Sequence, residues 1–192
     1  MDDRLYRFLK WTAIILAAAW LGWAVYENFF LGKEPGEYKR AAASRYFSDG
    51  DYQKALEGYD EALSVNPEFS GAKWGRAETL IMLNREYEAV EIYDELIALQ
   101  PDVAANYANR GIALDRMGQY AEALASYEKA ISLDAETGDG PHWLTRLLRN
   151  QPEKPPGIAD RAAYLRQQLA LPIEDRLLRV PEIDEAQRPY KE

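Results

Sequence analysis

Five apolar columns recur three times in this chain at a constant spacing of 34 residues, and this period constrains the fold more than any other feature. The columns are Ala55/Ala89/Ala123, Leu56/Val90/Leu124, Tyr59/Tyr93/Tyr127, Leu63/Ile97/Ile131 and Val65/Leu99/Leu133. A fixed period of this length is typical of repeat proteins, in which one small unit is copied along the chain. A unit this short cannot bury its own apolar face, so we expect the copies to stack.

Each copy contains a second helical pattern upstream of its alanine and tyrosine columns. These patterns cover residues 38–47, 73–83 and 107–117, and turn residues follow at Asp49-Gly50-Asp51, Asn84-Arg85 and Gly118-Gln119. Small residues also recur at Ala43, Ala77 and Gly111. We expect these to face the tyrosines of the second helices or their neighbours, because small against large lets two antiparallel helices approach closely. The sequence therefore predicts an all-α fold.

The repeat resembles the tetratricopeptide repeat, a family with a 34-residue helix–turn–helix unit. The residues that carry the resemblance are Ala43, Tyr46, Gly50, Tyr52, Ala55, Tyr59, Ala62 and Pro67; then Ala77, Leu80, Ala89, Tyr93 and Pro101; then Tyr107, Gly111, Leu114, Gly118, Tyr120, Ala123, Tyr127 and Ala130. The second copy departs by having Tyr87 one place late, and the third by ending in Asp134-Ala135 without a proline. The resemblance implies a right-handed superhelical array of three hairpins over residues 36–69, 70–103 and 104–137.

The resemblance also implies a concave inner surface, formed by the first helix of each copy, that binds a segment of a partner protein. Carried over position by position, the predicted partner-binding residues are Arg40, Ser44, Phe47, Trp74, Glu78, Met82, Asn109, Ile112 and Arg116. For Trp74 two interpretations stay open, an anchor for the partner or a packing residue between copies.

Some members of the family clamp the carboxylate of a chaperone tail with asparagines and basic side chains on these helices. The corresponding positions here hold Arg40, Ser44, Gly75, Ala105 and Asn109, of which only Arg40 is basic. The resemblance therefore implies a peptide-binding array without that clamp. We expect an apolar or aromatic-anchored segment to be preferred over an anionic tail.

Residues 1–31 differ from the repeats and predict one transmembrane helix. The 16 residues from Trp11 to Tyr26 carry no charge, and apolar flanks extend the segment to about the 20 residues needed to cross a bilayer. We expect residues 8–30 to contact the lipid. A cleaved signal peptide is the alternative, since Ala17-Ala18-Ala19 satisfies the small-residue rule for cleavage.

The positive charges on the two sides of this segment are nearly balanced, with Arg4, Arg7 and Lys10 before it and Lys33, Lys39 and Arg40 after it. The short basic N-terminal tail favours a cytoplasmic N-terminus. The array would then lie outside, in the periplasm if the membrane is a bacterial inner membrane. A linker of only residues 32–35 would hold the array against the membrane surface, so we expect membrane-embedded or membrane-associated protein partners.

The repeat pattern ends after residue 137. A short helical run at His142 to Arg149, a proline-rich break, and a helical pattern through Ile158, Ala162, Leu165 and Leu169 predict capping helices over residues 138–171. Residues 172–192 predict one short helix up to Arg179 and an extended tail, because Val180-Pro181 and Arg188-Pro189 disfavour helix.

The composition excludes several classes of function. A net charge of −9 opposes binding to nucleic acid, and the chain has no cysteine and only one histidine, His142. These absences leave no thiolate metal site, no histidine cluster and no cysteine nucleophile, so we predict no cofactor and no enzymatic activity. The prediction is a membrane-anchored interaction scaffold or adaptor in the assembly of a membrane or envelope complex. The alternative is a permanent accessory subunit of a membrane complex.

Overall fold

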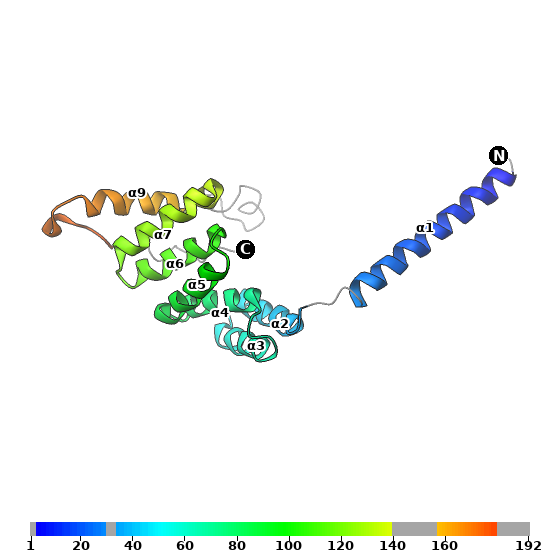
Figure 1. The fold of residues 1–192 in the computed structure, drawn as a ribbon, viewed down its shortest axis with the longest axis horizontal. Helices are drawn as coiled ribbons and strands as arrows, with labels where there is room; N and C mark the ends of the chain where they lie inside the picture. The colour runs from blue at the N-terminus through cyan, green and yellow to red at the C-terminus, as the bar shows by residue number, and fades with distance from the viewer. Residues whose placement is uncertain (1–2, 30–33, 140–156, 180–192) are drawn as a thin grey trace.

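The computed structural model describes residues 3–29, 34–139 and 157–179, and all regular structure in these ranges is helical (Figure 1). The elements in chain order are α1 (Asp3–Phe29), α2 (Glu37–Ser48), α3 (Tyr52–Val65), α4 (Ser70–Met82), α5 (Glu86–Leu99), α6 (Ala104–Arg116), α7 (Tyr120–Leu133), the 3₁₀ helix η1 (Ala135–Asp139), α9 (Ile158–Leu169) and the 3₁₀ helix η2 (Ile173–Asp175). The predicted all-α fold is confirmed.

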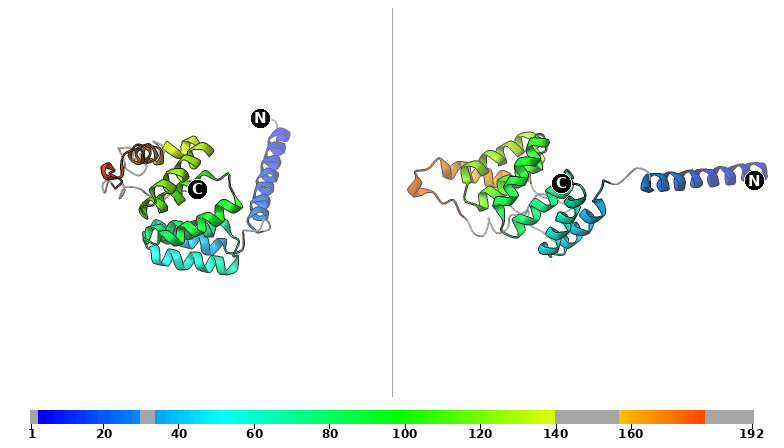
Figure 2. Two further views of the ribbon diagram at one scale, coloured as in Figure 1. Left: turned by 60° about the vertical axis from the view of Figure 1, so that its left-hand side comes forward. Right: turned by 60° about the horizontal axis from the view of Figure 1, so that its bottom comes forward.

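Helices α2 to α7 form three successive hairpins that stack on one another (Figure 2). The turn inside each hairpin contains one residue with positive φ: Gly50 at 81°, Asn84 at 57° and Gly118 at 78°. These three positions are 34 residues apart, and a left-handed residue after the last helical turn is how helices commonly end. Glycine adopts this conformation without strain, and asparagine is among the other residues that tolerate it.

The small residues and the tyrosines meet in two different ways. A Cβ atom at Gly111 would lie 2.6 Å from the Tyr127 ring, so the predicted small-to-large contact joins α6 and α7 within the third hairpin. The Tyr59 ring instead lies against Gly75 of the next hairpin, while Ala43 meets Gly58 within its own. Tyr127 therefore packs between the two helices of its own hairpin, whereas Tyr59 packs between its hairpin and the next one.

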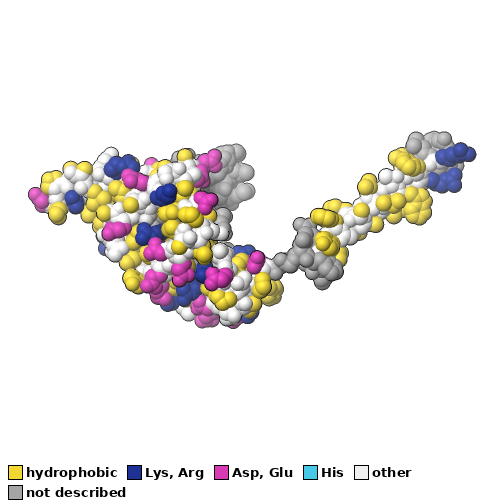
Figure 3. Space-filling model, viewed as in Figure 1, with side chains coloured by type: hydrophobic (Ala, Val, Ile, Leu, Met, Phe, Trp, Pro, Cys, Tyr) yellow, Lys and Arg dark blue, Asp and Glu magenta, His cyan; other side chains and the backbone are white. Residues whose placement is uncertain are grey.

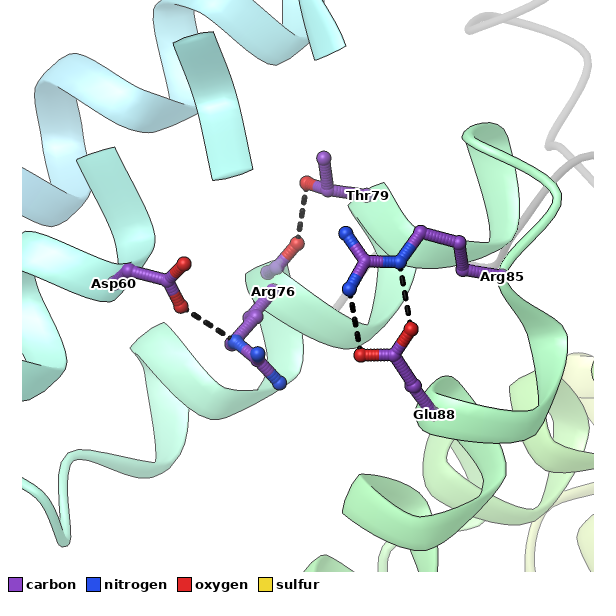
Figure 4. A network of polar contacts seen from close by, with 6 residues as sticks. Asp60, Arg76, Thr79, Arg85 and Glu88 are labelled. Atoms are coloured by element: carbon purple, nitrogen blue, oxygen red, sulfur yellow. Dashed lines mark hydrogen bonds and ion pairs between the residues drawn. The ribbon is translucent and has the colours of Figure 1, made fainter. Parts of the chain in front are cut away.

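A line of ion pairs joins the end of one copy to the start of the next. Figure 4 shows the first of these pairs, in which Arg76 of α4 points to Asp60 of α3. The three pairs in chain order are Arg76–Asp60 at 2.6 Å, Arg110–Asp94 at 2.6 Å and Arg166–Glu128 at 2.7 Å. The carboxylates are 34 residues apart throughout, but the third arginine belongs to α9.

Helix α9 therefore packs on α7 in the way that α4 packs on α3 and α6 on α5. Ile158, Ala162 and Leu165 are buried in the same core cluster as the side chains of α4 to α7. The N–H of Gly157 donates to the Asp160 carboxylate at 2.9 Å, which stabilises the start of α9. A cap of this kind covers the apolar end of the array.

Two expectations for the C-terminal part have different outcomes. The helical run expected at His142 to Arg149 lies outside the described residues. The short helix expected up to Arg179 is instead the single turn of η2, after which Arg176 is extended. The reason is that Leu171, Ile173 and Leu177 are exposed, so no buried face stabilises a longer helix there.

Helix α1 is one continuous helix whose stretch Tyr6–Tyr26 is long and apolar enough to cross a membrane. None of this stretch is buried against other parts of the protein, and hydrophobic side chains cover it along its length with basic side chains at its N-terminal end (Figure 3). A helix that is apolar on all faces and packs on nothing has its side chains available to lipid. A signal sequence has the same length and composition, so that alternative stays open.

Candidate partner-binding face

The first helices of the three hairpins, α2, α4 and α6, contact one another in order and form one side of the array. We call this side the inner face. The nine predicted partner-binding residues lie on these three helices: Arg40, Ser44 and Phe47 on α2, Trp74, Glu78 and Met82 on α4, and Asn109, Ile112 and Arg116 on α6. The second helices carry most of the exposed acidic residues of the repeats on the other side of each hairpin.

Burial divides the nine residues into two groups. Trp74, Glu78, Asn109 and Ile112 are buried, whereas Arg40, Ser44, Phe47, Met82 and Arg116 keep part of their surface exposed. The buried group lies in the middle copy and on the adjacent part of α6. The centre of the inner face is therefore part of the packed core, and the partly exposed side chains lie around it.

At the α2 end, Arg40 is held by a bidentate ion pair. Its guanidinium donates to the two carboxylate oxygens of Glu37 at 2.8 and 2.7 Å and lies 5.9 Å from the centre of the Phe69 ring. Phe69 is the last residue of the first copy, directly before α4, and the sequence comparison with the family did not single it out. The positive charge of Arg40 is thus largely balanced, which agrees with a face that lacks an anion clamp.

Two buried tyrosines lie behind this face. Burial raises the pKa of Tyr59, and the hydroxyl of Ser44 opposes that rise. Burial raises the pKa of Tyr93 well above its ordinary value, with the Glu78 carboxylate adding to the effect and Asn109 opposing it. Both tyrosines are therefore neutral at physiological pH, and the apolar character of the core behind the inner face is preserved.

Trp74 combines the properties of a packing residue with one unsatisfied group. Its side chain is 9% exposed and belongs to the core cluster that contains Leu80 and Ile112, as the packing interpretation expects. Its indole Nε1–H, however, is buried without a hydrogen-bond acceptor among the groups that the structure describes. A buried donor without an acceptor costs about 1–3 kcal/mol, and a carbonyl oxygen would satisfy this one only after the side chain turns toward the surface.

At the α6 end, the inner face is closed by the C-terminal part of the chain. Arg161 of α9 forms a buried ion pair with Asp115, with both N–O distances at 2.7 Å, and also donates to the carbonyl oxygen of Leu178 at 3.0 Å. Tyr127 donates to the same carboxylate at 3.1 Å. Arg116 donates from Nη1 to the carbonyl oxygen of Ile81, which ties α6 to α4.

The described residues contain no group of three or more His, Asp or Glu side chains that could hold a metal ion. What they do contain is a stack of helix hairpins, one side of which carries apolar side chains, uncharged polar groups and the charged Arg40, Glu78 and Arg116 around a buried tryptophan. These features define a helical-repeat protein whose inner face is suited to binding another polypeptide.

Family models identify the repeat. Residues 46–109 match one tetratricopeptide repeat model and residues 104–136 match a second, which supports tetratricopeptide repeats in this part of the chain. Repeats of this type are typically interaction modules without catalytic activity.

Several solved structures share the fold. The TPR2B domain of yeast Sti1, in a structure described as its complex with pHsp70, is 25% identical, with a TM-score of 0.51 over 62% of this chain and 94% of that one. The first TPR domain of human RPAP3 is 20% identical, with a TM-score of 0.53 over 71% and 98% of the two chains. The Sgt2 TPR domain from Aspergillus fumigatus is 19% identical, with a TM-score of 0.53 over 78% and 93%. A comparison with curated protein sequences gave no match.

Proposed function

We propose that the protein is a membrane-anchored scaffold or adaptor whose inner face binds an extended or helical segment of a partner protein during assembly of a membrane or envelope complex. The observation that carries the proposal is the buried Trp74 indole N–H without an acceptor, at the centre of that face. A peptide backbone carbonyl would satisfy this donor. The yeast Sti1 TPR2B domain, described in complex with pHsp70, supports a role in binding polypeptide segments.

The partner segment is expected to be apolar or aromatic rather than anionic. Arg40 is already neutralised by Glu37, and Asp115 and Arg161 neutralise each other. The partly exposed Phe47 and Met82, near the C-terminal ends of α2 and α4, offer further apolar contacts. Binding would therefore depend on apolar burial and on one hydrogen bond to the indole, and only weakly on salt.

The anchor restricts the choice of partner. If α1 spans a membrane, with the array in the periplasm of a bacterial cell, the short linker keeps the array near the membrane surface. Partners would then be membrane proteins or proteins that assemble on them. The apolar surface and length of α1 support the anchor.

Site-specific photo-crosslinking tests the proposal. A photoreactive residue at Met82 is expected to form adducts with the partner in native membranes, whereas the same residue at Tyr87, exposed on α5, is expected to form none. Trp74→Phe keeps an aromatic side chain but replaces the indole with a smaller ring that has no N–H, so it should reduce the adduct at position 82 in a variant whose thermal unfolding shows that the array is still folded. Equal adducts at both positions, or an unchanged adduct in Trp74→Phe, would contradict a binding role for the inner face.

A permanent accessory subunit is the second candidate, and one observation favours it. Leu171, Ile173 and Leu177 are exposed together around η2, where a neighbouring subunit could cover them. A subunit would remain bound in fixed stoichiometry through detergent purification. An adaptor would be recovered with its partner only in part, and mainly with incompletely assembled complexes.

A further inference from the structure

One side of α2, at the start of the array, is not covered by any helix among the described residues, whereas the equivalent sides of α4 and α6 pack on the preceding copy. Ala72 of α4 belongs to the cluster formed with Tyr59 and Ala62 of α3, so this side of α4 packs on the preceding copy. The side of α6 that begins with Asn106 packs on α5 in the same way. The equivalent position on α2 is Tyr38, and no described element precedes it except α1, which packs on nothing.

The exposed fractions of equivalent side chains differ strongly between α2 and α4. Tyr38 is 87% exposed, while Ala72 is fully buried. Tyr46 is 42% exposed, while its equivalent Leu80 is fully buried. Arg45 follows Tyr38 by two helical turns and therefore lies on the same side of α2. It is also exposed.

The types of residue on this face also differ from those in the buried copies. Small or aliphatic side chains at the equivalent positions are replaced by two tyrosines and an arginine. The ammonium of Lys54 on α3, which forms an ion pair with Asp51, lies 5.7 Å from the centre of the Tyr46 ring. Tyrosine and basic side chains together are typical of surfaces at the bilayer interface, where an apolar ring and a polar tip are both accommodated.

The residues just before α2 contact the C-terminal end of α3. Glu34 accepts a hydrogen bond from Asn66 at 3.3 Å, and a Cβ atom at Gly36 would lie 2.7 Å from the carbonyl oxygen of Ala62. The chain before α2 is therefore fixed against the end of α3. Only residues 30–33 separate this fixed point from α1, a reach of at most roughly 20 Å.

We infer that the Tyr38, Arg45 and Tyr46 face of α2 docks onto the headgroup region of the same bilayer that α1 spans. The inference rests on the membrane anchor in the proposed function. The bilayer takes the place of a preceding hairpin, so that the first repeat is capped by lipid as the last repeat is capped by α9. Docking would fix the orientation of the inner face relative to the membrane.

The chain has no cysteine, so single-cysteine variants can carry an environment-sensitive fluorophore. Tyr38→Cys probes the face, and Tyr87→Cys is the matched control, because Tyr87 is also a surface tyrosine, 66% exposed, on the second helix of another copy. The full chain is incorporated into phosphatidylcholine vesicles that contain a lipid spin-labelled on its headgroup. Flotation of the protein with the vesicles first establishes whether α1 inserts.

The expected result is that the spin-labelled lipid removes most of the fluorescence at position 38 and leaves that at position 87 unchanged. Flotation with equal quenching at both positions, or with none at position 38, would overturn the docking while leaving the anchor intact. Disulfide-linked dimers of unlabelled Tyr38→Cys would identify a second copy of the chain as the occupant and would also overturn it. A protein that does not float would overturn the anchor itself.

Discussion

The guanidinium of Arg161 and the carboxylate of Asp115 form a buried, bidentate ion pair that joins α9 to the last helix of the inner face. The two residues are 46 positions apart, and only Asp115 belongs to the repeat. Both side chains are almost completely buried, so neither charge can be solvated if the other is removed. The cap is therefore fastened to the array through a charge pair as well as through the apolar contacts of Ile158 and Leu165.

Arg161→Met is predicted to destabilise the array, because it leaves the Asp115 carboxylate buried without its partner. Loss of one member of a buried pair costs about 3–5 kcal/mol. The free energy of unfolding from urea titration measures the loss, and the exposed pair Arg85–Glu88 provides the control. Arg85→Met should cost at most about 1 kcal/mol.

A triple variant separates the buried charge from the packing around it. Asp115→Leu, Arg161→Met and Tyr127→Phe together remove the ion pair and the hydroxyl that donates to Asp115. Replacing a buried pair by apolar groups is often neutral or stabilising, so much of the stability lost in Arg161→Met should return. If the triple variant is as unstable as the single one, the cost lies in packing and not in the unpaired charge.

Gly111→Ala is predicted to destabilise the third hairpin, because the added Cβ would lie 2.6 Å from the Tyr127 ring. Overpacking of this kind costs about 1–3 kcal/mol, and it acts against a gain of about 1 kcal/mol in helix propensity. Thermal unfolding followed by circular dichroism measures the net effect. Ala125→Gly, at an exposed position of α7, reports propensity alone. A stabilised Gly111→Ala variant would show that α6 and α7 can separate without cost.

The stability of the array is predicted to fall at alkaline pH because of Tyr93. Burial raises the pKa of Tyr93 above the ordinary value of 10.0, so above pH 10 the unfolded state has released a proton that the folded state still holds. The stabilisation is complete below pH 10 and is lost as pH rises through the higher folded pKa. Tyr93→Phe should flatten this decline, as measured by urea titration at a series of pH values. A decline of equal slope in the variant would assign it to other groups.

Deletion of residues 1–31 is predicted to release the array from membranes in folded form. The part of α1 from Tyr6 to Tyr26 packs on nothing else, so its removal exposes no new core surface. Fractionation and circular dichroism give the readouts, with the full chain in detergent as the reference. A truncated protein that aggregates would show that the array depends on the N-terminal segment for folding.

The repeat period allowed most of the array to be predicted. The positive-φ residues at 50, 84 and 118 lie in the predicted turns, and the paired helices lie between them, because a 34-residue unit repeats its turn chemistry as well as its apolar columns. The partners of each tyrosine were less predictable. Whether Tyr59 meets its own hairpin or the next depends on small differences in helix approach, and no spacing along the chain records these.

The candidate site shows the same division. The nine residues predicted from the sequence lie on the first helices α2, α4 and α6, and their role in binding a partner stays a prediction. The sequence did not indicate that α9 and Leu178 close the α6 end, because Arg161 lies outside the periodic region. The sequence also could not predict that the Trp74 N–H has no acceptor. Whether a donor finds an acceptor depends on all the groups that surround it in the folded structure.

The sequence alone determined the helical hairpins, their number and the apolar segment at the N-terminus, because each is a local or periodic property of the chain. Only the tertiary structure decided how the array ends. Arg166 of α9 continues the line of inter-copy ion pairs at one end, and Tyr38 stands exposed where a preceding copy would pack at the other. The ends of a repeat array have no neighbouring copy to define them, so their contacts follow from the folded chain and not from the period.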